Sequence, residues 1–237
     1  GDKILDAGSG FGNMSKTAAK IVDNDLKIIL YDPLVPMLKN TDRLFNEKMD
    51  SACGVFEHVP FQDKEFDAVL SGYSLRDAIS LKTAISEMHR VLKEDGKWVI
   101  VDLGKPDEPF FRFGVTFYLR MILPIIALIA GGRLGLKFGT LYGTYKLWPQ
   151  NKKLESMLLE KFSRVEFEKD LMGGAIMVAI TFPLQFFPEV SKKLTEDSYS
   201  APYLAMVLDF VNQNPGSLNI RKKLSDFDLE GAKEKFE

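Results

Sequence analysis

Near the start of the chain, residues 3–12 read KILDAGSGFG. An apolar run ends in an acid, and three glycines follow at every second position. Glycines with this spacing allow a backbone to turn tightly between a strand and a helix and to approach a ligand closely. Residues from about 15 to 22 then show a helical pattern. The stretch predicts a strand, loop and helix with a ligand site at the carboxyl end of the strand.

Two details of the loop separate candidate ligands. The dinucleotide fingerprint needs a third glycine three positions after the second, and Asn13 occupies that position. The acid before the loop would repel a pyrophosphate, but it would attract a ligand that carries an ammonium and a sulfonium. The loop therefore favours S-adenosyl-L-methionine, with S-adenosyl-L-homocysteine as product, over NAD. The loop residues expected to bind this cofactor are Asp6, Gly8, Ser9, Gly10 and Gly12.

A second acid, Asp32, ends the next strand pattern and lies twenty positions after Gly12. An acid at this place can accept hydrogen bonds from the two hydroxyls of a ribose. The alternative interpretation of Asp32-Pro33 is a turn that ends the strand. We expect the ribose role because of the loop upstream.

Strand-like and helical patterns alternate up to about residue 102, which is typical of parallel β-α-β units. Residues 165–168 and 175–180 then predict two strands joined by a short turn, which makes an antiparallel hairpin. We therefore expect an α/β fold: a doubly wound, seven-stranded, mostly parallel sheet with one antiparallel edge hairpin strand. The helical face from Leu81 to Leu92 is expected to stop at Glu94-Asp95-Gly96, where Gly96 suits a left-handed cap.

The predicted domain organisation follows from changes in composition along the chain. Residues 1–181 form the predicted domain, an apolar helical insertion at 107–148 serves as its lid, and 182–237 form a C-terminal extension. The net charge of −2 gives no indication of a nucleic-acid partner. One Cys and two His are too few for a structural zinc site, so no metal is expected. The lone Cys53 indicates a reducing compartment, and hence a cytoplasmic location.

Several further segments carry a family resemblance. The glycine loop and Asp32-Pro33 with Met37-Leu38 are followed by Val59-Pro60-Phe61, by SGYSLRD at 71–77, by Arg90-Val91-Leu92-Lys93, by Gly104-Lys105-Pro106 and by LMGGA at 171–175. Together these residues resemble the ubiquinone/menaquinone biosynthesis C-methyltransferases, which are class I S-adenosylmethionine-dependent enzymes. The resemblance covers about residues 1–181 and is thin across the insertion.

The resemblance implies a Rossmann-like fold and C-methylation of a demethylated polyprenyl quinol of the menaquinone or ubiquinone type. It also implies further cofactor contacts, at Pro33, Met37, Phe56, Glu57 and Ser71. Val55 replaces the acid that usually receives the adenine amine, so the backbone amide of Phe56 and apolar packing are expected to hold adenine instead.

The segment after the fourth strand holds the expected catalytic residues. Arg76 could stabilise phenolate charge on the quinol, Asp77 could accept a proton, and Tyr73 could orient the ring. In the family, an Asn usually stands where this chain has Asp77. The alternatives are an ion pair between Arg76 and Asp77, or Asp77 as the N-cap of the Ile79–Leu92 helix.

Residues 113–130 are nearly all apolar, but Arg120 and Pro124 argue against a membrane-spanning helix. The stretch could form an isoprenoid tunnel over the site, or lie on a bilayer with Arg112, Arg120 and Arg133 at the headgroups. The plain alternative is a buried pair of lid helices. An apolar isoprenoid substrate would favour peripheral contact with a membrane.

Two other functions stay open at this point. The chain could methylate another apolar or lipid-like acceptor, or it could be a non-catalytic cofactor-binding or interaction module. The intact glycine loop and Asp32 weigh against the module. The sequence leaves open whether the protein forms a homodimer.

Overall fold

The computed structural model describes residues 1–21, 26–41, 49–131 and 139–180. The described residues belong to two compact units. The first contains residues 1–115 and 143–180, and the second contains residues 116–131 and 139–142. The second unit falls inside the predicted insertion 107–148, whose role as a lid stays a prediction. The predicted extension 182–237 lies outside the described residues.

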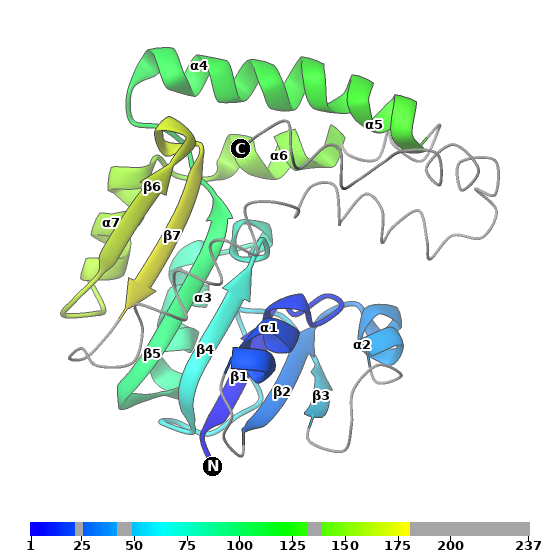
Figure 1. The fold of residues 1–237 in the computed structure, drawn as a ribbon. Coiled ribbons are helices and arrows are strands. Elements are labelled where there is room, and N and C mark those ends of the chain that lie inside the picture. Colours follow the sequence, from blue (N-terminus) through cyan, green and yellow to red (C-terminus); the bar gives the residue numbers. More distant parts are fainter. Residues whose placement is uncertain (22–25, 42–48, 132–138, 181–237) are drawn as a thin grey trace. The chain divides into compact units, whose positions relative to one another are not determined.

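The first unit is built on a seven-stranded sheet (Figure 1). Its strands lie in the order β3-β2-β1-β4-β5-β7-β6. Strands β1 to β5 pair in parallel, and β7 runs antiparallel to both β5 and β6. This confirms the predicted fold class, with the antiparallel strand one place in from the edge. The strands are β1 Lys3–Ala7, β2 Lys27–Asp32, β3 Met49–Cys53, β4 Phe66–Gly72, β5 Leu92–Leu103, β6 Glu166–Asp170 and β7 Ala175–Ile180.

Helices cover both faces of the sheet, because successive residues of its inner strands point to opposite sides. In β2, Ile28 and Leu30 pack in one apolar cluster and Ile29 and Tyr31 pack in the other. In Figure 1, α1 lies in front of the strands and α3 behind them. The helices are α1 Asn13–Ile21, α2 Val35–Thr41, η1 Leu75–Asp77, α3 Leu81–Val91, α4 Pro109–Phe117, the π-helical η2 Tyr118–Ile122, α5 Leu123–Gly131, α6 Gly139–Leu147, α7 Asn151–Leu159 and η4 Leu171–Gly173.

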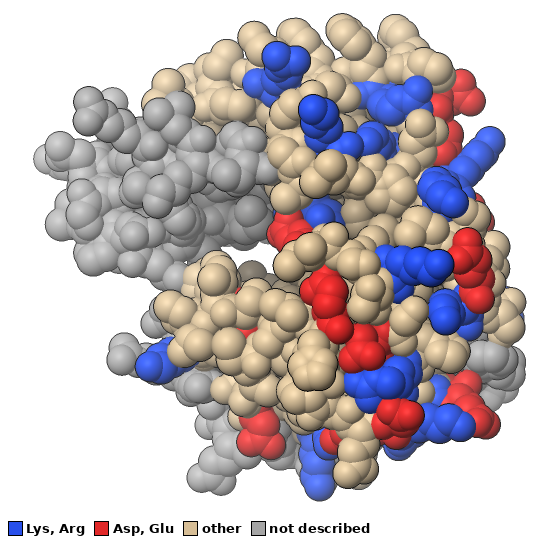
Figure 2. Space-filling model, turned by 180° about the vertical axis from the view of Figure 1, so that it is seen from behind, with Lys and Arg blue, Asp and Glu red and all other residues tan. Residues whose placement is uncertain are grey.

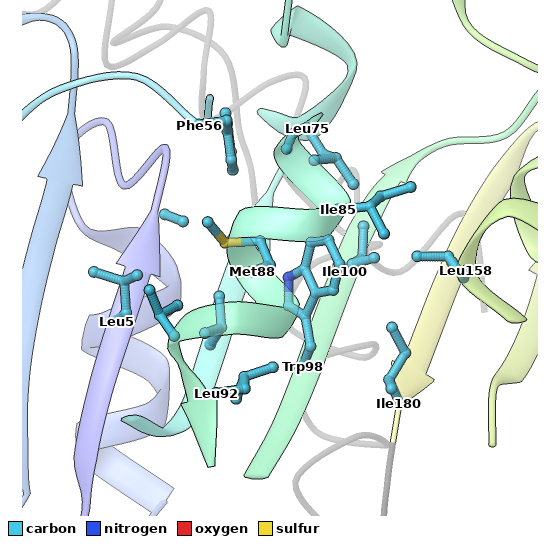
Figure 3. Packing of buried hydrophobic residues seen from close by; sticks show 14 of the residues in the cluster. Leu5, Phe56, Leu75, Ile85, Met88, Leu92, Trp98, Ile100, Leu158 and Ile180 are labelled. Atoms are coloured by element: carbon cyan, nitrogen blue, oxygen red, sulfur yellow. The ribbon is translucent and has the colours of Figure 1, made fainter. Parts of the chain in front are cut away.

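The larger apolar cluster packs α3 against β4 and β5 and so fixes their positions relative to one another. Trp98 on β5 is fully buried and faces Met88 on α3, with Ile100 and Leu75 beside them (Figure 3). Burial of side chains of this size contributes about 1.5–3 kcal/mol each. The cluster therefore fixes where β4 ends and where the residues that follow it lie.

The end of α3 differs from the sequence-based expectation. The helix ends at Val91, Leu92 is already extended, and residues 93–96 belong to β5. The cause is a register shift, since Phe66 pairs with Leu92 but Ala68 pairs with Lys97. The extra residues bulge between these pairs. The predicted left-handed cap at Gly96 is therefore wrong, because the left-handed glycines among the described residues are Gly8, Gly10, Gly12 and Gly173.

Charged side chains of both signs are interspersed over the surface shown in Figure 2. Several of them join neighbouring elements of the sheet unit. Lys93 Nζ of β5 lies 2.6 Å from Asp67 Oδ1 of β4, and Lys64 Nζ, just before β4, lies 2.5 Å from Glu94 Oε1 of β5. Exposed pairs of this kind each add at most about 1 kcal/mol.

Candidate functional site

The glycine loop requires its glycines. Gly8, Gly10 and Gly12 have φ angles of 74°, 53° and 71°, a region that other residues rarely adopt. The amides of Gly8 and Ser9 donate to the carbonyl of Tyr31, at 2.7 and 3.1 Å. This pins the loop to the end of β2, at the carboxyl edge of the sheet where α/β folds bind ligands.

Asp32 holds this loop in place. Its Oδ2 accepts from the amide of Gly10 at 2.9 Å, and its Oδ1 accepts from the amide of Leu34 at 2.8 Å. The structure thus contains the turn that was the alternative interpretation. A carboxylate has about four lone-pair sites, so these two bonds leave capacity for ribose hydroxyls. The ribose role stays a prediction.

The other predicted contacts on this strand end lie beside the loop. Met37 is half-buried, and its Sδ lies 3.9 Å from where a Cβ on Gly10 would stand. Pro33 is exposed, directly after Asp32. The structure therefore brings Met37 to the loop, and leaves the surface of Pro33 open.

Asp6 is buried at the end of β1. Its Oδ2 accepts from the hydroxyl of Ser15 at 2.6 Å and from the amide of Ser15 at 3.2 Å. Burial raises the pKa of Asp6 to about 6, against the effect of the two Ser15 bonds, and the charge of Asp32 adds to the rise. Asp6 thus fastens α1 to the loop. Sequence reasoning missed Ser15, which lies in the expected helix without a motif of its own.

Ser9 bears on whether a cofactor fits the loop. Its hydroxyl is buried and has no hydrogen-bond partner in the part of the chain that the structure describes. A buried hydroxyl without a partner costs about 1–3 kcal/mol. A polar ligand seated on the loop could satisfy it. The orphaned hydroxyl and the three left-handed glycines therefore fit a cofactor with polar groups such as S-adenosylmethionine.

The segment expected to meet adenine is fixed against β2. Tyr31 Oη lies 3.0 Å from the carbonyl of Val55 and 2.9 Å from that of His58. The buried ring of Phe56 lies 3.3 Å from where a Cβ on Gly8 would stand. Glu57 Oε1 accepts from the amide of Ser80 at 2.9 Å. Phe56 therefore lies beside the loop, and Glu57 holds the start of α3.

Ser71 lies inside the sheet. Its side chain is fully buried, and its hydroxyl accepts from Trp98 Nε1 at 3.1 Å. A ligand at the carboxyl edge could therefore meet only the backbone of Ser71.

The residues after β4 contact the glycine loop directly. Tyr73 has a left-handed φ of 54°, and its amide donates to Val101 on β5 at 2.7 Å. Ser74 Oγ donates to the carbonyl of Ala7 at 3.0 Å, and a Cβ on Gly8 would collide with the side chain of Ser74. Strained backbone of this kind clusters at active sites. The expected cofactor loop and the expected catalytic residues thus form one site.

Arg76 is held by a residue that sequence reasoning missed. Its Nη1 donates to Oδ1 of Asp102 at 2.6 Å, and the Asp102 side chain is fully buried at the end of β5. The distance from Arg76 Nε to Asp77 Oδ1 is 4.0 Å. The main partner of Arg76 is therefore Asp102. An acid at the end of the apolar run WVIV was the available signal, since parallel strands end at the same edge.

Asp77 is not the cap of α3. The helix starts at Leu81, and Ser80 is its N-cap, with a side chain that accepts from the amide of Thr83. The Asp77 side chain is 55% exposed. Partial burial raises the pKa of Asp77 and the charge of Asp102 adds to the rise, whereas Arg76 and a hydrogen bond from Thr144 oppose it. Of the alternatives for Asp77, the cap is wrong.

Two of the resembling motifs have structural roles. Arg90 donates to the carbonyls of Phe61 and Val59, at 2.8 and 2.9 Å, which fixes the 59–61 loop. Asn151 is buried and joins two motifs, because it accepts from the amide of Lys105 and donates to the carbonyl of Gly173, both at 2.8 Å. Sequence reasoning missed Asn151, which no motif marks.

Within the described ranges, no group of three or more His, Cys, Asp or Glu side chains could hold a metal ion.

Comparisons with known proteins add the family. The chain matches the ubiE/COQ5 methyltransferase family over residues 1–183. It is 33% identical over 131 residues to the demethylmenaquinone methyltransferase of Symbiobacterium thermophilum, and the match covers 53% of this chain and 52% of that protein. It is 32% identical over 181 residues to the ubiquinone/menaquinone biosynthesis C-methyltransferase UbiE of Chromobacterium violaceum, covering 74% of this chain and 72% of that protein. The chain thus spans about half the length of the first relative.

Solved structures agree on the fold. The CurJ carbon methyltransferase superposes with a TM-score of 0.55 at 17% identity, over 76% of this chain and 48% of that chain. An S-adenosylmethionine-dependent methyltransferase from Thermotoga maritima superposes with a TM-score of 0.50 at 16% identity, over 76% of this chain and 82% of that chain. At these identities the likeness shows the fold alone.

Proposed function

Because the chain belongs to the ubiE/COQ5 methyltransferase family, we propose that it methylates a ring carbon of a demethylated polyprenyl quinol, with S-adenosylmethionine as the methyl donor. The functions by which its two relatives are named, demethylmenaquinone methyltransferase and ubiquinone/menaquinone biosynthesis C-methyltransferase, support this class of acceptor. The predicted family and enzyme class agree with these comparisons. The assignment of roles to individual residues rests on the site geometry.

The cofactor is assigned to the edge formed by β1 and β2. Gly8, Gly10 and Gly12 allow close approach of the backbone, and the buried Ser9 hydroxyl offers a hydrogen bond. Asp32 would receive the ribose hydroxyls. Phe56, whose ring lies beside Gly8 of the loop, would pack against adenine. When bound, the cofactor supplies an activated methyl group.

One observation carries the proposal: Ser74 contacts the glycine loop through the carbonyl of Ala7, at 3.0 Å. The adjacent residues from Tyr73 to Asp77 therefore lie beside the place where the methyl group would be presented. Methyl transfer depends on holding a nucleophilic carbon in line with that group. A rigid turn in contact with the cofactor loop can do this.

The proton chemistry is assigned to Asp77. The new carbon–carbon bond would form as the carbon–sulfur bond breaks. The quinol hydroxyl would give a proton to the base, the methylated ring carbon would then lose its own proton, and the oxygen would regain one, so that one proton is released in all. Asp77 is half-exposed and has a raised pKa, so it can accept a proton directly or through water. Arg76 is fixed by Asp102, and its positive charge would stabilise the phenolate.

The test is an assay of methyl transfer from S-adenosylmethionine to demethylated menaquinol and ubiquinol, with Asp77→Asn and Asp95→Asn compared. Asp95 is exposed and lies in the β5 bulge, away from the turn. We expect Asp77→Asn to lower kcat by about a hundredfold or more with the cofactor Kd unchanged. Asp95→Asn should match the parent protein. Full activity of Asp77→Asn would remove Asp77 from the mechanism, and activity only on other apolar acceptors would overturn the quinol assignment.

A further inference from the structure

A long apolar helix lies on the surface of the described chain. Residues 109–129 run through α4, η2 and α5 as one helix that is long and apolar enough to cross a membrane by length and composition. Only 17% of its most apolar 18-residue stretch is buried, whereas the core helix of a soluble protein is mostly buried. Soluble monomers rarely expose an apolar surface of this extent, and such surfaces usually mark a site of interaction with a protein or a membrane.

Two stripes of apolar residues recur along this helix. Four more large apolar residues, Tyr118, Ile122, Ile126 and Leu128, lie outside both stripes and are also exposed. Leu119, Leu123 and Ala127 recur every four residues and are buried. A second set also recurs at helical spacing, but it is exposed: Phe110, Phe113, Phe117, Met121, Ile125 and Ile129. We define this second set as the apolar stripe. The first stripe is thus buried within the protein, and the second is exposed to solvent.

The sheet unit exposes a second apolar element beside the start of this helix. The side chains of Leu171 and Met172 are exposed. Both residues also have left-handed backbone, with φ angles of 46° and 56°. The adjoining Gly174 lies against Val115 of α4. Strained backbone that presents two large apolar side chains to solvent costs free energy, so it indicates a use for their exposure.

Charge identifies the partner. From residue 109 to 154 the sequence contains no Asp or Glu, whereas Arg112, Arg120, Arg133, Lys137 and Lys146 lie between 109 and 149. Each Lys or Arg near an anionic membrane surface adds to the attraction between the protein and the bilayer. Apolar side chains together with cations, and without acids, are the composition of helices that lie in a lipid interface.

Polar residues along the helix decide between lying in the membrane and crossing it. Arg112, Thr116 and Arg120 are spaced four residues apart and so form one polar line. Arg120 stands near the middle of the helix, with its guanidinium 5.8 Å from the centre of the Tyr142 ring. A charge at the centre of a spanning helix is costly. A helix that lies in the interface can keep this line at the headgroups.

We propose that the helix of residues 109–129 docks the protein on an anionic lipid bilayer, lying in the interface with its apolar stripe inserted. Within the sheet unit, the exposed Leu171 and Met172 add an apolar contact beside the start of α4. The proposal does not rest on the reaction assigned above, because it concerns binding to lipid alone.

The test is flotation of the full chain with vesicles of phosphatidylglycerol mixed with phosphatidylcholine, and with vesicles of phosphatidylcholine alone. We expect binding to the anionic vesicles, weaker binding to the neutral ones, and release of the protein by 0.5 M salt (~3-fold above physiological) and by alkaline carbonate. Resistance to alkaline extraction would indicate a spanning helix and overturn the proposal. Equal binding to both kinds of vesicle would overturn the anionic partner.

A matched pair of variants locates the contact. Ile125→Asp changes the apolar stripe, and Leu159→Asp adds the same charge on α7; the two parent side chains are 56% and 50% exposed. We expect Ile125→Asp to weaken vesicle binding at least about tenfold, with Leu159→Asp unchanged. Phe113→Asp should repeat the effect in α4 if Ile125→Asp fails to fold, as judged by circular dichroism and S-adenosylmethionine binding. Equal vesicle binding by all variants would overturn the proposal. It would also be overturned if the parent protein binds no vesicles and Ile125→Asp converts a dimer to a monomer, because the stripe would then be a dimer interface.

Discussion

Asp6 and Asp32 both lie at strand ends beside the glycine loop, but their surroundings differ. Asp32 accepts two backbone amides, one on each oxygen. Asp6 is buried and receives both of its Ser15 bonds on a single oxygen, so burial dominates and its pKa rises to about 6. The negative charge of Asp6 therefore costs stability at neutral pH, a cost that a cationic ligand would offset.

The variant Asp6→Asn tests this cost. Because the pKa of Asp6 is raised on folding, its contribution to stability is fully present below pH 4 and is lost as pH rises through 6. Asn carries no such charge but can accept the same Ser15 bonds. Relative to the parent, the variant should gain about 3 kcal/mol of unfolding free energy between pH 4 and pH 7.5, measured by urea denaturation. A difference that does not change with pH would contradict the raised pKa.

The variant Gly8→Ala tests the loop. The added methyl group would collide with Ser74, and a φ of 74° costs an alanine about 1–2 kcal/mol. We expect at least tenfold weaker S-adenosylmethionine binding (~1.4 kcal/mol), measured by calorimetry. Gly114→Ala is the control, since a Cβ there meets nothing within 4 Å. Unchanged affinity in Gly8→Ala would show that the ligand does not use this loop.

At the level of single residues, the sequence predicted positions better than partners. The loop glycines and Asp32 follow from local spacing, and the structure places them at one edge. Asp102 and Ser15 could not be assigned in the same way, because their roles depend on contacts with distant residues. Asp102 binds Arg76, which is 26 positions away, and Ser15 binds Asp6, which is nine positions away. A sequence without a fold does not show which buried groups meet.

Elements follow the sequence where apolar residues recur with a clear period. The inner strands and α3 were predicted from such patterns. The edge strand β3 was not, because Asp50 and Ser51 interrupt the short apolar pattern of Met49–Cys53 and none of its residues is fully buried. The end of α3 was misplaced because a register shift in the sheet, rather than a glycine cap, decides where the helix stops.

Asn151 offers a test of how elements are joined. It starts α7 and links the segment after β5 to the turn before β7. Asn151→Ala should lower the unfolding free energy by about 2–4 kcal/mol, because it leaves the amide of Lys105 and the carbonyl of Gly173 without these bonds in a buried place. The exposed neighbour Lys152→Ala should change stability by less than about 0.5 kcal/mol. If Asn151→Ala lowers the unfolding free energy by less than about 1 kcal/mol, the link is dispensable.

At the level of the whole molecule, the first unit carries the candidate site within itself. The glycine loop, Asp32, the turn from Tyr73 to Asp77 and Asp102 all belong to it. The apolar insertion was visible in composition, but composition alone could not separate a buried lid from an exposed helix. That choice depends on which side chains the fold covers, and the structure leaves the apolar stripe exposed.

The most direct test of the central claim is calorimetric titration of the whole protein with S-adenosylmethionine and, separately, with NADH. We predict micromolar binding of S-adenosylmethionine and none of NADH. Saturation at a hundred times Kd should also stabilise the fold by about 2.7 kcal/mol. A folded protein that binds NADH, or that binds neither ligand, would contradict the assignment of the glycine loop to a methyl donor.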